Sequence, residues 1–104
     1  MPIGQATLMR VLPNRLDEFI SRAAESKKIF ERNGATVSFH RTIAGSEPQA
    51  VLVVSQVDDW AQWAQVAAKL EADADWAALD RKSADDPAVE ILSQGILQEF
   101  ELPL

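Results

Sequence analysis

Side chains able to perform chemistry are few in this chain of 104 residues, and His40 is its one histidine. It lies between Ser38 and Thr42 in an alternating stretch, where an imidazole could act as a general base or as a ligand of haem iron. A catalytic site needs several converging groups, and the sequence supplies no obvious partner for this one. We therefore carry three interpretations of His40: a catalytic base, a haem ligand, or a residue at a subunit interface or in solvent that bonds a backbone carbonyl.

Aromatic and basic residues supply the candidate ligand pocket. Trp60, Trp63 and Trp76 could line an aromatic binding site, although their helical spacing also fits simple core packing. Arg10 and Arg41 could hold a carboxylate of a small ligand, or could be charges at a sheet edge or an interface. The sequence leaves both pairs of alternatives open.

No motif indicates a metal site, a phosphate loop or an activated nucleophile. The acidic pairs at 58–59, 73–75 and 85–86 lack the glycine spacing of a calcium loop, and helix caps and solvated loops explain them better. The chain has no cysteine, which excludes thiolate ligands and a cysteine nucleophile. We expect neither a metal nor a cofactor.

Composition limits the class of protein. Sixteen acidic against ten basic residues give a net charge of −6, which repels the phosphates of nucleic acids. No apolar run approaches the ~20 residues of a membrane helix, and residues 1–10 lack the basic start and long apolar stretch of a signal peptide. We expect one soluble, cytoplasmic domain over residues 1–104 that binds neither nucleic acid nor membrane.

The stretch 50–63, AVLVVSQVDDWAQW, is the unit around which we expect the fold to be organised. It begins as an apolar β-branched run and continues as an amphipathic helix capped by Asp58 or Asp59, with Gln62 in a capping box. Elsewhere the pattern predicts strands over 3–12, 35–44 and 88–102, a helix over 15–32 capped by Asn14, and a short extra helix capped by Asp75. The segments 45–48 and 83–87 are predicted loops, and Gly95 a bulge.

The two main helices are predicted to be amphipathic. In the first, the apolar stripe comprises Leu16, Phe19, Ile20, Ala23 and Phe30, while Glu18 and Arg22 form a charge pair on the polar side. In the second, the buried stripe comprises Trp60, Trp63, Ala64, Ala67 and Leu70.

Strands and helices in the order βαββαβ predict a ferredoxin-like α+β fold, an antiparallel four-stranded sheet with both helices on one face. Every strand carries apolar residues on both sides, yet the helices can cover only one face. A large exposed apolar face is unusual in a monomer, so we expect a homodimer that packs sheet face on sheet face.

The VDDWAQW junction and the later segment EADADWAAL resemble sequences of the dimeric α/β-barrel superfamily, particularly its NIPSNAP-like and antibiotic-biosynthesis-monooxygenase-like branches. The resemblance implies a ligand site between the sheet and its helices. It also implies a range of activities, from cofactor-free oxidation of aromatic molecules to isomerisation and haem degradation. We expect a small cofactor-independent enzyme, monooxygenase-like or isomerase-like, that acts on an apolar or aromatic metabolite. The alternative is a non-catalytic module for small-molecule binding or assembly.

Overall fold

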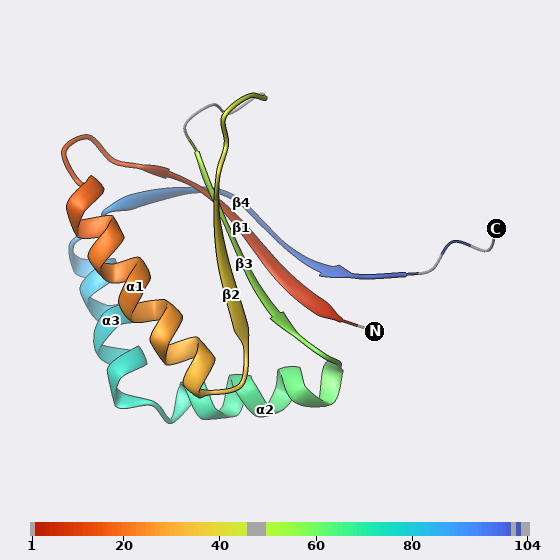
Figure 1. Cartoon of the computed structure of the whole chain (residues 1–104). Coiled ribbons are helices and arrows are strands. Elements are labelled where there is room, and N and C mark those ends of the chain that lie inside the picture. Colours follow the sequence, from red (N-terminus) through yellow and green to blue (C-terminus); the bar gives the residue numbers. More distant parts are fainter. Residues whose placement is uncertain (1, 46–49, 101, 103–104) are drawn as a thin grey trace.

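The structure, a computed structural model, describes residues 2–45, 50–100 and 102. Its elements follow in the order β1 (Ile3–Val11), α1 (Leu16–Arg32), β2 (Thr36–Arg41), β3 (Val51–Val57), α2 (Trp60–Glu71), α3 (Ala74–Asp85) and β4 (Val89–Gln98). The four strands form one antiparallel sheet in the order β2-β3-β1-β4. This is the ferredoxin-like α+β arrangement that the sequence predicts, with one additional helix (Figure 1).

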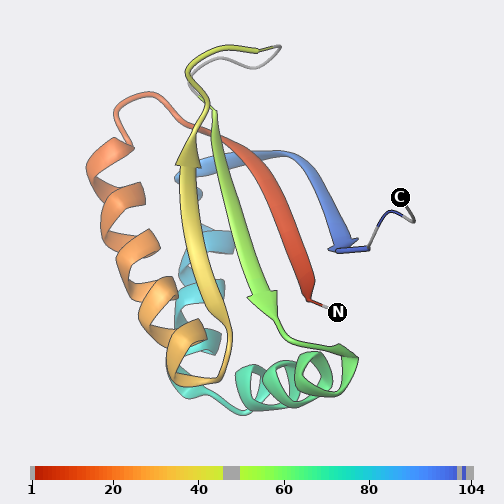
Figure 2. The same cartoon turned by 45° about the vertical axis from the view of Figure 1, so that its right-hand side comes forward.

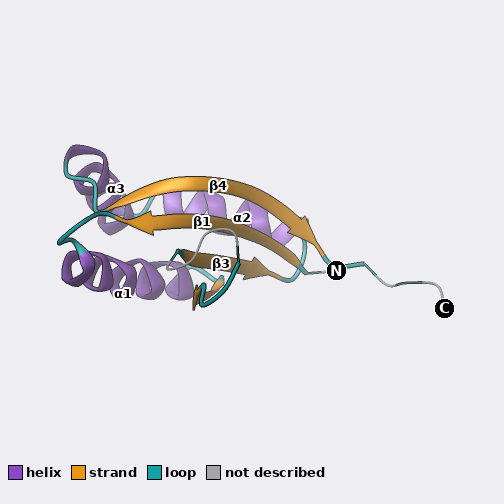
Figure 3. Cartoon of the chain, turned by 90° about the horizontal axis from the view of Figure 1, so that it is seen from above, coloured by secondary structure: helices purple, strands orange, loops and turns teal. Residues whose placement is uncertain are grey.

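The helices α1 and α3 lie side by side against the sheet, and α2 runs across the ends of the strands (Figures 1 and 2). Seen from above, β1 and β4 are strongly curved (Figure 3). The compact part of the core lies where α2 meets the sheet and consists of Ile3, Ala35, Val57 and Val66. Within the described residues, no helix combines the length and apolar composition needed to cross a membrane.

The strand register separates two faces of the sheet. Alternate residues of the strands point towards the helices and line cavities beneath them. They include Gln5, Thr7, Val37, Val53 and Ser55. Their neighbours point to the opposite face, which carries Ala6, Leu8, Leu52, Val54 and Leu97. None of these five residues lines a cavity beneath the helices, and Leu97 is 58% exposed.

The start of α2 confirms the predicted capping box. Asp59 occupies the N-cap position, and its Oδ1 accepts a hydrogen bond from the backbone N–H of Gln62 at 2.8 Å. The Gln62 amide oxygen accepts in turn from the N–H of Asp58 at 2.6 Å. The Gln62 amide nitrogen donates to the carbonyl of Gly34, which fixes α2 to the turn between α1 and β2.

The third helix is longer than the predicted short segment. It continues to Asp85 through most of the stretch predicted to be a loop, because no glycine or proline interrupts the chain before Pro87. Its N-cap is Asp73 and not Asp75, since the Asp73 carboxylate accepts from the backbone N–H groups of both Asp75 and Trp76.

Details of α1 also differ from the prediction. Asn14 adopts a left-handed φ of 63° and does not cap the helix, and Leu16 and Ile20 of the predicted apolar stripe are more than half exposed. Arg22 is instead buried, with 7% exposure, although it keeps the predicted pairing with Glu18 at 2.8 Å. The buried side of the helix therefore includes Arg22 and Ile29, and part of the predicted stripe faces outwards.

The last strand is shorter than predicted and ends at Gln98. Its irregularity lies where the register with β1 shifts between Leu8 and Met9, which leaves Leu92 as the extra residue. Gly95 pairs in register with Ala6, so the bulge predicted at Gly95 is wrong.

Candidate functional site

A cavity of about 530 Å³ lies between the sheet and the pair α1 and α3. Its walls are mainly apolar and include the rings of Phe19, Phe30, Phe39 and Trp76. Phe19 meets Phe39 edge-on with the ring centroids 6.5 Å apart, and Phe30 meets Trp76 in the same way at 4.9 Å. The volume falls within the range of about 300–1,000 Å³ typical of small-molecule sites.

The sheet contributes a polar strip to the floor of this cavity. Gln5 of β1 lies directly opposite Ser55 of β3, and Thr7 of β1 lies directly opposite Gln94 of β4. The Gln94 side-chain amide donates to the Thr7 hydroxyl at 3.1 Å. The side chains of Gln5 and Ser55 make no hydrogen bond to another described residue, so their donors and acceptors are available to a molecule in the cavity.

A second cavity of about 200 Å³ adjoins the first beneath α2. It is lined mainly by apolar side chains, including Val57, Trp63, Val66, Ala67 and Leu70. Four residues line both cavities: Gln5, Phe30, Ser55 and Trp76.

Arg22 and Asp80 are the ionisable residues among the described residues that line the larger cavity. The guanidinium of Arg22 donates to Glu18 Oε1 at 2.8 Å, to the backbone carbonyl of Asp86 at 2.6 Å and to Asp86 Oδ2 at 3.2 Å. Hydrogen bonds from Arg22 and Lys82 lower the pKa of Glu18, and the bond from Arg15 lowers that of Asp86. Arg22 therefore joins α1 to the turn that follows α3, and its charge is already compensated.

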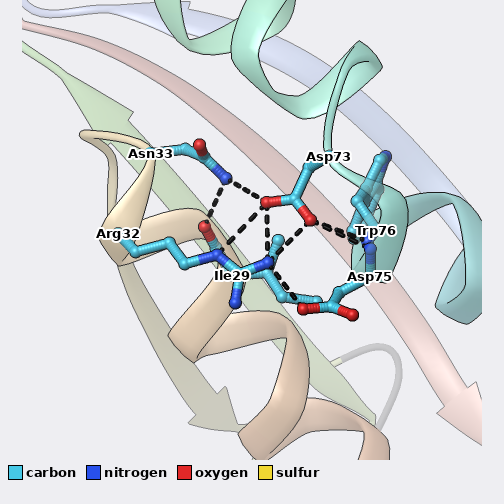
Figure 4. Close-up of polar contacts among 6 residues, drawn as sticks. All are labelled: Ile29, Arg32, Asn33, Asp73, Asp75 and Trp76. Atoms are coloured by element: carbon cyan, nitrogen blue, oxygen red, sulfur yellow. Dashed lines mark hydrogen bonds and ion pairs between the residues drawn. The ribbon is translucent and has the colours of Figure 1, made fainter.

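A second polar cluster joins the other end of α1 to the start of α3 (Figure 4). The guanidinium of Arg32 donates to the Asp73 carboxylate at 2.6 Å and to Asp75 at 3.0 Å, and the Asn33 amide donates to Asp73 at 2.9 Å. The bond from Arg32, followed by that from Asn33, holds the pKa of Asp73 well below its usual range. Because Asp73 also caps α3, the cluster fixes the helix turn that carries Trp76.

The predicted pocket residues are distributed over different parts of the fold. Trp76 lines both cavities and Trp63 lines the smaller one. Trp60 is 51% exposed, lines neither cavity, and packs edge-on against Trp63, so its predicted place in the buried stripe of α2 is wrong.

The predicted catalytic and basic residues lie outside both cavities. His40 is exposed on the sheet face away from the helices, where its Nε2 lies 2.9 Å from the Ser38 hydroxyl. Arg10 forms an exposed ion pair with Glu90 at 3.2 Å, and Arg41 is exposed at the end of β2. In the sheet, β3 lies between the strands that carry the two arginines. The roles predicted for His40, Arg10 and Arg41 stay predictions.

Several residues of the site belong to no sequence motif and were not predicted. Gln5, Thr7, Ser55 and Gln94 form the polar strip, and their signal is a polar residue at an inward position of an otherwise apolar strand. In contrast, no group of three or more histidine or acidic side chains within the described part of the chain could hold a metal ion.

Solved structures share this fold over nearly the whole chain. SnoaB, a cofactor-independent oxygenase from Streptomyces nogalater, has a TM-score of 0.70 and 12% identity, with 98% of this chain and 96% of that chain covered. An uncharacterised NIPSNAP domain protein from Burkholderia xenovorans has a TM-score of 0.72 and 17% identity, with 99% and 96% covered. A NIPSNAP family protein of unknown function from Agrobacterium tumefaciens has a TM-score of 0.66 and 14% identity, with 92% and 86% covered.

No protein-family model and no curated protein sequence matches the chain. The TM-scores establish a common fold, but at identities this low they establish no common activity. The chain therefore has the fold of NIPSNAP and antibiotic-biosynthesis-monooxygenase-like proteins, which confirms the resemblance found in its sequence.

Proposed function

We propose that the protein binds a small apolar or aromatic metabolite in the cavity between the sheet and the pair α1 and α3. The observation that carries this proposal is the combination of aromatic walls with a polar strip on the floor, within about 530 Å³. Apolar walls supply affinity by removing ligand surface from water, and a few placed polar groups fix its orientation.

The chemistry that we propose for this site is a cofactor-independent transformation, with oxidation as the first candidate. The support is the shared fold with SnoaB, a cofactor-independent oxygenase, and a site of the right size. In an oxidation of this kind O₂ is the oxidant and a phenolic substrate supplies all four electrons. One oxygen atom replaces a ring C–H hydrogen and becomes a quinone carbonyl, and the other leaves as water with that hydrogen and the phenolic hydrogen. The protein would contribute positioning and hydrogen bonds from groups such as Gln5 and Ser55.

A non-catalytic binding module is the second candidate. It is favoured by the scarcity of ionisable groups in the larger cavity, where Arg22 is already compensated and Asp80 is the remaining one among the described lining residues. Proton-transfer steps need a titratable group within hydrogen-bond reach of the substrate.

We also propose a homodimer in which the uncovered sheet faces meet. The support is the apolar set Ala6, Leu8, Leu52, Val54 and Leu97 on that face, away from the helices. Burial of such a face against a second copy is favourable because apolar surface leaves water.

We also propose a cytoplasmic location. It is supported by a chain without cysteine, since disulfides are rare in that compartment.

The binding proposal can be tested by calorimetric titration with 2-naphthol. The variant Ala23→Phe places a ring in the larger cavity, which Ala23 lines, and we expect it to weaken binding at least tenfold. The matched control is Ala24→Phe, at the next position of α1, which is exposed and lies outside the cavity lining. Equal binding by both variants, or no binding by the unmodified protein at millimolar probe, contradicts the proposal.

Turnover separates the two candidate functions. An oxygen electrode measures O₂ uptake when the protein is mixed with electron-rich phenols and hydroxynaphthalenes, with the free compounds as the background rate. Uptake above background that Ala23→Phe abolishes supports the oxidation. Binding of 2-naphthol without uptake across the panel supports the binding module.

A further inference from the structure

The two cavities beneath the helices meet at four shared residues: Gln5, Phe30, Ser55 and Trp76. We propose that they form one two-chamber site for an elongated, uncharged ligand. An aromatic ring occupies the larger chamber, a short aliphatic chain occupies the smaller one, and a neutral hydrogen-bonding group between them contacts Gln5 and Ser55. This inference rests on the proposed function and names the class of molecule that the site takes.

The junction between the chambers combines a polar floor with an aromatic cover. Gln5 and Ser55 face each other across β1 and β3, and neither side chain bonds another described residue. The rings of Phe30 from α1 and Trp76 from α3 meet edge-on at 4.9 Å and line both chambers. A carbonyl or hydroxyl of the ligand at this point finds both a donor and an acceptor in the Gln5 amide.

The smaller chamber suits an aliphatic chain. Away from the junction, its lining residues are Ala35, Val57, Trp63, Val66, Ala67 and Leu70, and the first two and Val66 are each at most 7% exposed. No charged side chain is among the described residues that line it. A polar or charged group placed there would lose its hydration without gaining a partner, whereas each methylene gains from leaving water.

The charge balance of the larger chamber selects against anions. Its one cation among the described lining residues is Arg22, and all three nitrogens of that guanidinium already donate to Glu18 or Asp86. The other ionisable lining residue, Asp80, is an acid. A carboxylate ligand would therefore meet no uncompensated positive charge, which makes its desolvation costly.

Alkyl phenyl ketones test the inference, because they carry a ring, a neutral carbonyl and a chain of adjustable length. Calorimetric titration with acetophenone, butyrophenone and hexanophenone should show affinity rising about fourfold per added methylene until the smaller chamber is full. The variant Ala67→Phe, which introduces a ring at the wall of the smaller chamber, should remove this gain.

The matched control is Ala68→Phe, at an exposed neighbouring position of α2 outside both linings, which should retain the full dependence on chain length. A second filling variant, Leu70→Phe, enlarges a half-buried residue of the same wall, since a ring introduced at position 67 could turn towards solvent. Phenylalkanoates of equal length should bind at least tenfold more weakly than the ketones.

The outcomes separate this inference from the proposed function. If acetophenone binds but the gain with chain length survives in both filling variants, the two-chamber site is wrong and the binding function stands. If phenylalkanoates bind as tightly as the ketones, the selection for uncharged ligands is wrong. If neither the ketones nor 2-naphthol bind, both the inference and the proposed function fail.

Discussion

The indole of Trp76 meets the ring of Phe30 edge-on, with the ring centroids 4.9 Å apart and the ring planes at 70°. This pair joins α3 to α1 and lies where the two cavities adjoin. Its position depends on Asp73, which caps α3 three residues before Trp76 and binds Arg32 of α1. Stability and the shape of the candidate site therefore depend on the same few residues.

We expect Trp76→Ala to destabilise the protein by about 3 kcal/mol and to weaken acetophenone binding, because it removes a half-buried ring and leaves one larger, poorly filled space. Urea denaturation measures the first effect and calorimetry the second. The control is Trp60→Ala, since Trp60 is 51% exposed and lines neither cavity. Equal effects of the two substitutions on binding would contradict the place assigned to Trp76.

The ion pair between Arg32 and Asp73 predicts a dependence of stability on pH. The folded pKa of Asp73 lies below that of the unfolded chain, so its ionised form stabilises the fold at neutral pH. This contribution is complete above the unfolded pKa of about 3.9 and is lost as the pH falls from there towards the folded pKa. We expect Asp73→Asn, which retains a capping side chain, to lower the free energy of unfolding at pH 7 and to flatten its decline below about pH 4.

Urea denaturation at several pH values measures this effect, and a double-mutant cycle isolates the pair. Arg32→Gln alone should flatten the same part of the profile, and the double variant should add little to either single change. Additive effects would mean that Asp73 acts through its cap and Asn33, without coupling to Arg32.

The uncovered sheet face predicts the oligomeric state. Leu52 lies on this face next to Leu8, and Leu52→Lys places a charge on it in each copy. An unpaired buried charge should weaken the dimer about a hundredfold or more, which light scattering at micromolar protein detects as conversion to monomer. The control is Ala68→Lys on the exposed side of α2. A monomeric unmodified protein would remove the dimer from the proposal.

The location of His40 predicts that its substitution does not affect ligand binding. His40 lies on the sheet face opposite the cavities, so we expect His40→Ala to leave the affinity for 2-naphthol unchanged within about twofold. A loss of O₂ uptake with unchanged binding would support the predicted catalytic role. A Soret shift when the unmodified protein is mixed with haem, absent in His40→Ala, would support haem ligation through this residue instead.

Element types followed from local patterns, whereas the boundaries of α3 and β4 did not. The capping box at Asp59 and Gln62 involves neighbours in the chain, so its spacing is sufficient to predict it. Leu16 and Ile20 fit an apolar stripe by period, yet they are exposed, whereas Arg22 of the same helix is buried and donates to the carbonyl of Asp86, 64 positions away. Periodicity carries no information about such a distant charged contact.

By itself, the sequence determined the alternation of strands and helices, the antiparallel pairing of β2 with β3, and the ferredoxin-like order, because these depend on hydrophobic period, turns and caps. The tertiary structure alone decided which residues meet. It brought Gln5, Ser55, Phe30 and Trp76 from four different elements to one junction and placed His40 on the other face. The physical reason is that a cavity is formed by the register and twist of distant strands and by the docking of helices on them, and neither is encoded in any single segment.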